Sequence, residues 1–480
     1  IEKHKEEILD KKDKFSEKRL KKQFSLASNY QLREIILNGQ VSFGDTLTNY
    51  VNQVSQNILK NYEFSKKENL EFYVFKSSQI NSFTSDDGKI FISIGLLAQL
   101  ETEAQLAYVL CREISHFIKQ HAFSGYRFKR SYNGLYNGVF NNKDAFLIKS
   151  NFDQKKELIA DSMGLKIFLK SDYGVASLNG VFDILQFSYL PIDEIEFEPY
   201  LFENKNYKIR KELLLDSVNS ISLINSKNEK SNYNKIKDRK DKFKNLFQEK
   251  QRKGKQFVFP KDRFFNSRNI ARFELTQILL ERRMYQALLY NNYVLFKDFP
   301  NNSYLIKTTS KALYYLSKYK LRGLDNVIDT SQSIQGESHR LYYLFQNISD
   351  LELALITVNY IWESYQKLPH LKELHDMASE ILNEVVYLKK LDKDLFLRKS
   401  KEGLIVQNKV SGKEKYERSR KYKRIAEKKV KKRESQKIYN IFVDLFLDQK
   451  FSDIFDFSFS NAIRLRDGGQ VVDQPQKKSK

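Results

Sequence analysis

Residues that interrupt or cross-link a chain are scarce in this sequence of 480 residues, which has one cysteine, six prolines and 17 glycines. The single cysteine, Cys111, excludes an intramolecular disulfide framework and a zinc site built from several cysteines. So few prolines and glycines favour long helices over turn-rich β structure. No apolar run reaches the ~18 residues that a membrane-spanning helix needs, so the sequence predicts no such helix.

Acidic residues are also under-represented. The chain has 60 Asp and Glu but 83 Lys and Arg, which gives a formal net charge of +23. That charge predicts an anionic partner, which can be nucleic acid, a lipid surface or an acidic protein. Hydrophobic residues make up 41% of the chain and aromatic residues 14%. This composition is sufficient for a substantial core, and the length predicts two or three domains.

Residues 106–121 predict a helix that carries an altered metal-binding motif. The helical spacing is that of Leu106, Val109, Leu110, Ile114, Phe117 and Ile118. Inside it lies Arg112-Glu113-Ile114-Ser115-His116. With histidine at position 112 this would be H-E-x-x-H, in which two imidazoles one turn apart hold zinc and the glutamate is the general base.

A second predicted helix offers carboxylates to the first. Glu157 and Asp161 are four residues apart and therefore share one helix face. The carboxylate of Glu157 could be the third zinc ligand, and Asp161 would support the site without binding the metal itself.

Residues ~45–250 resemble the zinc peptidase family that includes HtpX, BepA and the CAAX prenyl protease. The resemblance rests on segments in the family's order: Tyr50-Val51-Asn52-Gln53-Val54, Asn81-Ser82-Phe83, Gly88-Lys89-Ile90-Phe91-Ile92, Gly95-Leu96-Leu97, Arg112 to His116, Glu157-x-x-Ala160-Asp161-x-x-Gly164, Asp172-Tyr173-Gly174 and Ser231 to Arg239. It implies an α+β gluzincin-like peptidase domain in which His116 and Glu157 hold zinc and Glu113 is the general base. It also implies an edge strand that binds extended peptides, formed by Lys89, Ile90, Phe91, Ile92 and Ser93.

Arg112 is the departure that bears on function. Arginine has no lone pair for a metal and stays protonated. The two remaining ligands fall short of the three that catalytic zinc needs. On a continuous helix His121 lies about 140° around the axis from His116, so we predict that it does not replace the missing ligand, and the same spacing excludes Cys111.

We therefore predict a vestigial metal site that holds no metal and no active catalytic residue. Its members are Arg112, His116, Glu157 and Asp161, with Glu113 as a vestigial base. Without a metal these carboxylates would be crowded, which is costly when they are buried and unpaired. We hypothesise that the Arg112 guanidinium forms an ion pair with Glu157 through two hydrogen bonds and so supplies the positive charge of the missing ion. The alternative is that Arg112 is a surface residue that changed by neutral substitution and has no role at the site.

The rest of the chain predicts helices, so the expected fold is mainly α with a small β-sheet. Helices expected at 272–280, from 285 to a stop at 299–302, and at 304–319 have a spacing that resembles a tetratricopeptide repeat. Further pairs are expected at 351–365 and 369–387. The predicted domains are an N-terminal helical arm (1–44), the peptidase-like domain (45–262), a tetratricopeptide-like domain (263–396), and a basic helical extension with a disordered tail (397–480).

By resemblance, this order of domains is that of the BepA branch of the family, which acts in outer-membrane protein assembly in the periplasm. We predict a catalytically inactive protein-binding scaffold or chaperone of a bacterial cell envelope, without a cofactor, in the periplasm or on the periplasmic face of the outer membrane. Its candidate partner is the outer-membrane β-barrel assembly complex. The chain begins with Ile rather than Met, so we expect that a preceding segment, such as a signal peptide, was removed.

Two other functions stay open. One is an active zinc metalloendopeptidase of envelope quality control, for which zinc would be the cofactor. The other is a nucleic-acid-binding protein, which only the charge suggests, since no nucleic-acid module is recognisable. The dense basic run at 413–433 is typical of a solvated helix face, but its large excess of positive charge also fits contact with an anionic membrane surface.

Overall fold

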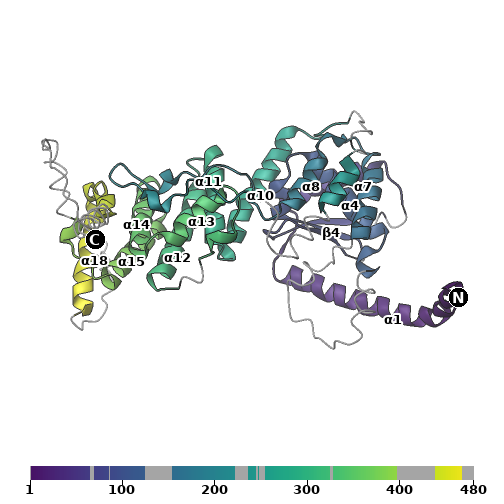
Figure 1. Ribbon diagram of the computed structural model, residues 1–480, viewed down its shortest axis with the longest axis horizontal. Helices are drawn as coiled ribbons and strands as arrows, with labels where there is room; N and C mark the ends of the chain where they lie inside the picture. Colours follow the sequence, from purple (N-terminus) through teal and green to yellow (C-terminus); the bar gives the residue numbers. More distant parts are fainter. Residues whose placement is uncertain are drawn as a thin grey trace, which may run out of the picture. The chain divides into compact units, whose positions relative to one another are not determined.

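The computed structural model describes residues 2–64, 67, 70–85, 87–124, 154–221, 236–244, 247, 254–324, 328–396 and 438–466. This part of the chain is mainly helical with one small sheet, which confirms the predicted fold class (Figure 1). The chain divides into two compact units, residues 1–192 with 222–278 and residues 193–221 with 279–480. The basic run at 413–433 and the predicted tail from 467 onward lie outside the described residues.

The first unit contains a mixed sheet in the order β1-β2-β4-β3. Its strands are β1 (Val41–Ser42), β2 (Glu71–Phe75), β3 (Ser82–Thr84) and β4 (Lys89–Ser93). β4 pairs in parallel with β2, in the register Phe72 to Ile90 and Val74 to Ile92. All four of these side chains are buried, so burial of one common face accounts for this register.

The prediction that residues 89–93 form the edge strand is wrong. β4 lies inside the sheet, with β2 on one side and antiparallel β3 on the other, and β3 is the strand at the edge. The turn that ends in Gly88 makes β3 and β4 a hairpin, but a hairpin pattern alone does not decide which of its strands faces outward. The long-range pairing of β4 with β2 decides it.

Helices that carry the candidate site cover one face of this sheet (Figure 1). The helices of this unit beyond α1 are α2 (Thr46–Lys60), α3 (Ile94–Gln99), α4 (Glu103–Ile118), α7 (Gln154–Phe168), the short η2 (Val175–Ser177), α8 (Asn179–Gln186) and α10 (Lys261–Glu281), whose last three residues belong to the second unit. α4 begins after its cap Thr102 and is buried at nearly every position. It is buried because it contacts β3 and β4 of the sheet and packs along α7.

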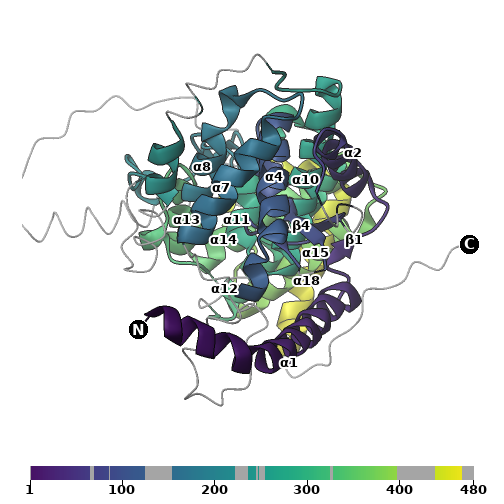
Figure 2. The ribbon, with the colours of Figure 1, turned by 90° about the vertical axis from the view of Figure 1, so that its right-hand side faces the viewer.

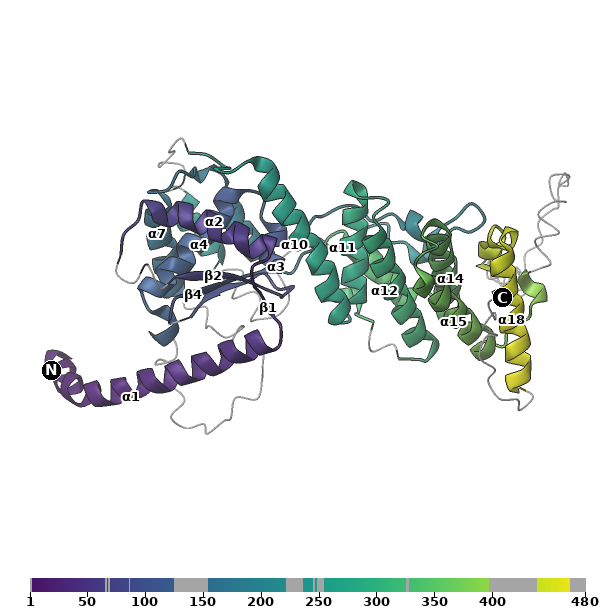
Figure 3. The ribbon, with the colours of Figure 1, turned by 180° about the vertical axis from the view of Figure 1, so that it is seen from behind.

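The other face of the sheet is covered by α1 (Glu2–Leu37). Leu32 and Ile35 of α1 pack with Val41, Phe75 and Phe91. Figure 2 and Figure 3 show α1 on the side of the sheet opposite to α4. The predicted N-terminal arm is therefore, in its second half, a layer of the first unit.

A buried carboxylate ties the first unit together at the start of α4. Glu103 is fully buried and accepts hydrogen bonds from the hydroxyls of Tyr50 and Tyr173 and from the backbone N–H groups of Val258 and Phe259. A buried charge is tolerated when donors surround it in this way. Two of the family-like segments, those around residues 50 and 173, thus meet at one carboxylate.

The second unit is a stack of antiparallel helices. They are α11 (Tyr285–Asp298), α12 (Ser303–Leu321), α13 (Ser338–Asn347), α14 (Asp350–Lys367), α15 (Lys372–Leu388) and α18 (Gln449–Arg466), with the short helices η3 (Pro199–Phe202), η4 (Lys211–Leu213), η6 (Ser331–Ser333), η7 (Ile438–Phe442) and η8 (Leu445–Leu447). The helices expected from 285, at 304–319, at 351–365 and at 369–387 are present close to those bounds, and Asn302 caps α12 where a stop was expected. The helix expected at 272–280 is instead part of the longer α10, which begins at Lys261 and lies in the first unit as far as Ile278. The assignment of these helices to tetratricopeptide repeats stays a prediction.

Residues 193–221 belong to the second unit, whereas the sequence placed them in the peptidase-like domain. Polar side chains along this segment bond to the helices. Tyr207 donates a hydrogen bond to buried Glu352 of α14, and Arg210 forms an ion pair with the same carboxylate at 2.7 Å. Such contacts are invisible in local sequence patterns.

Within the described residues, every helix is too short or too polar to cross a bilayer.

Candidate functional site

Two helices, α4 and α7, bring the predicted site residues together. α4 carries Arg112, Glu113 and His116, and α7 carries Glu157 and Asp161. The helices approach closely at Gly164, where an added Cβ would lie 3.1 Å from the Cα of Arg112. A glycine at this position therefore lets the two helices come near enough for their side chains to bond.

Arg112 bonds to both carboxylates of α7. Its Nη2 lies 2.6 Å from Oε2 of Glu157, and its Nε lies 2.7 Å from Oδ1 of Asp161. The predicted ion pair between Arg112 and Glu157 is thus confirmed. The side chain is buried, so the alternative of a surface arginine turned to solvent is wrong.

A second guanidinium completes the cluster from a segment far along the chain. Arg239, in the helical segment 236–244, donates from Nε and Nη2 to the two oxygens of Asp161 at 2.7 and 2.8 Å. Its Nη2 is also 3.2 Å from Oε2 of Glu157. Two buried cations therefore balance two carboxylates. We call these four residues, Arg112, Glu157, Asp161 and Arg239, the arginine–carboxylate cluster.

The sequence pointed to Arg239 only as the end of a family-like segment and did not predict this role. The charge balance of the predicted site was a signal for this role. Arg112 is one cation and Glu157 and Asp161 are two carboxylates, so one negative charge would lack a partner. That signal does not say which of the many basic residues supplies the second cation.

Glu113 is held by the edge strand. Its Oε1 accepts a hydrogen bond from the Ser82 hydroxyl at 2.7 Å, and its Oε2 accepts one from the Thr84 hydroxyl at 2.9 Å. The carboxylate is buried. Both oxygens of the candidate general base are therefore engaged with β3, a contact that the sequence did not predict.

His121 lies beside His116, so the predicted separation of about 140° is wrong. That prediction assumed a continuous helix, but α4 ends at Ile118 and Gln120 adopts a left-handed conformation with φ of 50°. The chain therefore turns back, and the Nδ1 atoms of the two imidazoles are 2.9 Å apart. Nε2 of His116 lies 3.5 Å from Oε1 of Glu157.

The neighbours of the two ring nitrogens favour one tautomer of neutral His116. A bare Nε2 would face a carboxylate, so the stable tautomer carries its proton there and accepts at Nδ1 from the Nδ1–H of His121. The lone pair of His116 then faces His121 rather than Glu157.

These residues do not fit the zinc site that the motif implies. Catalytic zinc takes three protein ligands, whereas this site offers His116 and Glu157 and has the guanidinium of Arg112 at the third position. His121 does not complete the set of ligands, because it contacts Nδ1 of His116, whereas Glu157 lies near Nε2 of that ring. One metal ion cannot bind at both nitrogens of the same imidazole. Among the residues that the structure describes, no group of three or more His, Cys, Asp or Glu side chains is arranged to hold a metal ion.

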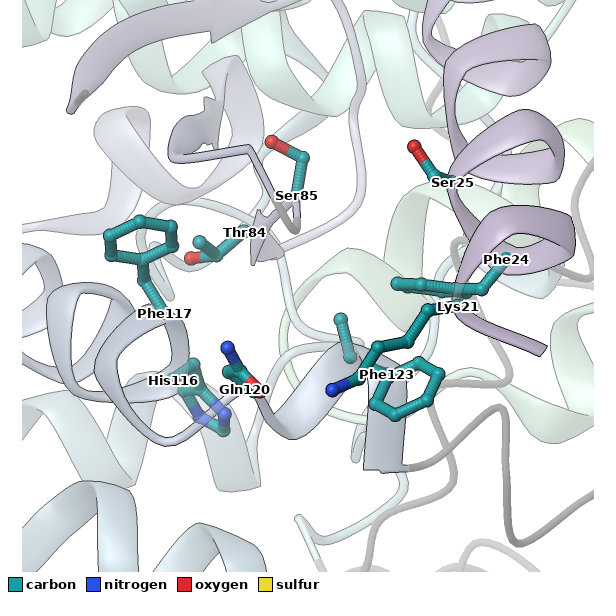
Figure 4. A pocket seen from close by; sticks show the side chains of 10 residues that line it. Lys21, Phe24, Ser25, Thr84, Ser85, His116, Phe117, Gln120 and Phe123 are labelled. Carbon is teal, nitrogen blue, oxygen red and sulfur yellow. The ribbon is translucent and has the colours of Figure 1, made fainter. Parts of the chain in front are cut away.

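A small cavity opens beside His116, between α1, the end of β3 and the turn after α4 (Figure 4). Its volume is about 200 Å³, and its lining includes Lys21, Thr84, Phe117 and Phe123. This is below the roughly 300 Å³ at which pockets for whole small molecules begin. The cavity therefore suits one side chain of a larger ligand.

Glu157 should make the stability of the first unit depend on acid pH. Burial alone would raise the pKa of this carboxyl, but the positive charges of His116 and of the two arginines outweigh it and lower the pKa from 4.5 to about 2. Because the folded pKa lies below the unfolded one, the stabilisation is complete above the unfolded value and is lost as the pH falls towards 2. The difference corresponds to about 3 kcal/mol.

The measurement is urea unfolding of the wild type and of Glu157→Gln at several pH values. The stability advantage of the wild type over the variant is expected to be largest near neutral pH and to shrink between about pH 5 and pH 2. An advantage that stays constant over this range would contradict the assignment.

Part of this chain is similar to known peptidases. A family model described as Peptidase family M48 matches residues 45–214. The beta-barrel assembly-enhancing protease of Yersinia pestis is 27% identical over 93 residues, which cover 19% of this chain and 19% of that protein. The match thus spans about a fifth of the length of that relative. This chain therefore contains a domain of peptidase family M48, the zinc peptidase family that the sequence motifs predicted, and residues 45–192 of the match lie in the first unit.

Proposed function

We propose that this M48 domain binds extended polypeptide without cleaving it, and that the protein is a binding scaffold or chaperone of a bacterial cell envelope. One observation carries the proposal. The guanidinium of Arg112, bonded to Glu157 and Asp161, stands at the position where the zinc-binding motif has a histidine. A zinc ion would supply a Lewis acid and a bound water of lowered pKa, which peptide hydrolysis by this motif requires.

The position of Glu113 supports the same proposal. A general base has to reach the water that it activates. Here the carboxylate is buried and its two oxygens accept hydrogen bonds from Ser82 and Thr84. Its contacts are those of a structural link between α4 and β3.

Binding is proposed at β3 by addition of a strand. In and beside β3, residues 81, 83 and 85 are the ones whose main-chain groups face β4 and hydrogen-bond to it. The main-chain groups of Ser82 and Thr84 therefore point the other way, and among the described residues no strand pairs with that side. An extended segment can pair there, and one of its side chains can enter the cavity beside His116.

The partner and the location are proposed from the relative. Its name links it to β-barrel assembly, so we propose the outer-membrane β-barrel assembly complex as partner and the periplasm, or the periplasmic face of the outer membrane, as the location. The stacked helices of the second unit, proposed as tetratricopeptide-like, would offer the docking surface for this partner. Crosslinking in the native cell, followed by identification of the linked proteins, tests the partner.

The test of the proposal is the zinc content and proteolytic activity of the purified wild type. We expect far less than one zinc per chain, and cleavage of unfolded casein no faster than that of the matched variant Glu113→Gln. The opposite result, one zinc per chain with cleavage that depends on Glu113, would establish the active metallopeptidase instead.

A further inference from the structure

The outward side of α1 carries a stripe of exposed cations and large apolar side chains. Along the helix it consists of Arg19, Lys22, Leu26, Tyr30, Arg33 and Leu37, all exposed. The spacing of three and four residues puts them on one side of the helix. We call this set the α1 stripe.

The α1 stripe is opposite to the face that packs on the sheet. The inward positions are Phe24, Ser28, Leu32 and Ile35, and all of them are buried. In Figure 2 α1 runs along the margin of the first unit, so its outer side is turned away from the sheet. The stripe therefore plays no part in the core of this unit.

The apolar members of the stripe are too exposed to be explained by folding. Leu26 is 61% exposed, Tyr30 64% and Leu37 67%. Isolated exposed apolar side chains are common on proteins, but a row of them on one helix side marks an interaction surface. From residue 19 to residue 37 the stripe is about 27 Å long at 1.5 Å per residue.

The charge along the helix selects the partner. Residues 18–37 contain five basic residues and one acidic residue, Glu34. The stripe holds three cations and three large apolar side chains on one side of the helix, so any partner must accept both kinds of group along one line. An anionic bilayer does so, because apolar side chains enter the acyl boundary while the long stems of Arg and Lys keep their charges at the headgroups.

We propose that the α1 stripe lies on an anionic phospholipid surface. The proposal is independent of whether the M48 domain cleaves peptides. It differs from the contact expected for the basic run at 413–433, because it requires insertion of apolar side chains and not charge alone.

A fluorescent reporter on the stripe tests the insertion in the full-length protein. The native Trp362 is fully buried in the second unit and gives a constant background. In Tyr30→Trp, mixing with phosphatidylglycerol vesicles should shift the emission to shorter wavelength, and brominated acyl chains should quench it. The matched control is Leu447→Trp, at a position 88% exposed in the second unit, where neither change is expected.

Substitutions separate the two contributions to affinity. Replacing Arg19, Lys22 and Arg33 together by glutamine should weaken vesicle binding on the order of a hundredfold at ~0.15 M salt, about fivefold per cation. Replacing Leu26 and Leu37 by glutamine should weaken it at least tenfold while leaving the net charge unchanged. Circular dichroism should show an unchanged fold, since these side chains are exposed.

Four results would overturn the proposal. The first is vesicle binding without quenching at position 30, which would assign the binding to the basic run instead. The second is no binding to anionic vesicles at ~0.15 M salt. The third is a dimer in sedimentation that dissociates in Leu26→Gln. The fourth is saturable binding of an acidic protein to the stripe while the reporter at position 30 shows no lipid contact. Either of the last two would assign the stripe to protein partners.

Discussion

Replacing Arg112 by histidine is expected to give a chain that binds one zinc ion, whereas the wild type is expected to bind far less than one. The other two donor atoms already lie close together, because Nε2 of His116 and Oε1 of Glu157 are 3.5 Å apart. Zinc binding would take the proton from Nε2 of His116, as metal binding to histidine requires. Two donors of one tetrahedral zinc ion, each 2.0–2.1 Å from the metal, lie about 3.3 Å from one another. A histidine at position 112, one helical turn before His116, would add the third donor.

The effect should be large and easy to measure. Zinc at a thousandfold excess over its Kd stabilises the folded state by about 4 kcal/mol, so zinc should raise the unfolding temperature of Arg112→His and not that of the wild type. The matched control is Arg112→Met, which also removes the cation but adds no strong zinc donor. Equal zinc binding by both variants would show that the residue at position 112 is not what excludes the metal.

Zinc binding, and not proteolysis, is the proper readout of this experiment. Glu113 is bonded to Ser82 and Thr84, and cleavage requires in addition that this carboxylate reaches the metal-bound water. Metal content and thermal stability report the change at position 112 without that second requirement.

Replacing Arg239 by alanine is expected to lower the free energy of unfolding of the first unit by about 3–5 kcal/mol. Removing one partner of a buried ion pair leaves the other charge buried and unpaired, and this unpaired charge is what destabilises the folded state by several kcal/mol. Arg239 is 1% exposed, and Asp161, to which it donates two hydrogen bonds, is fully buried. The variant would leave Arg112 alone to neutralise two carboxylates.

The neighbouring residue provides the control. Lys240 also forms an ion pair, with Asp183, but its side chain is 27% exposed and that of Asp183 is 43% exposed. Exposed pairs contribute about 0–1 kcal/mol, so Lys240→Ala should change stability little. Equal losses in the two variants would contradict the role of the arginine–carboxylate cluster.

The two units have to be followed separately in these unfolding experiments, because a chain with two units need not unfold in one step. The fluorescence of Trp362 reports the second unit. Hydrogen exchange of the amides of α4 reports the first. The loss in Arg239→Ala is expected in the exchange of α4 and not in the fluorescence transition.

Much of the candidate site followed from local pattern and charge. The spacing of Glu157 and Asp161 put both carboxylates on one helix face, and the cost of burying them unpaired predicted the contact with Arg112. The helices of the second unit followed in the same way from apolar periodicity. In each case the information lies within a few turns of one helix, where sequence spacing translates directly into direction.

The predictions that failed depended on where an element ends or on what a distant segment contributes. Periodicity continued the helix through His121, whereas the chain leaves it after Ile118. Residues 89–93 were expected at the edge of the sheet, but the pairing of β4 with β2 decided that β3 is the edge. Residues 193–221 contact helices more than a hundred positions away, and no local pattern carries that information.

The sequence by itself determined the chemistry of the site, because the types of residue at positions 112, 116, 157 and 161 limit the metal donors whatever their arrangement. It also determined the two kinds of structure, a small sheet with helices and a helical stack. Only the tertiary structure decided that Arg239 balances the charge, that Ser82 and Thr84 hold Glu113, and that one side of α1 is left exposed. These features depend on contacts between segments far apart in the chain, which arise when apolar faces are buried together and not from any local preference.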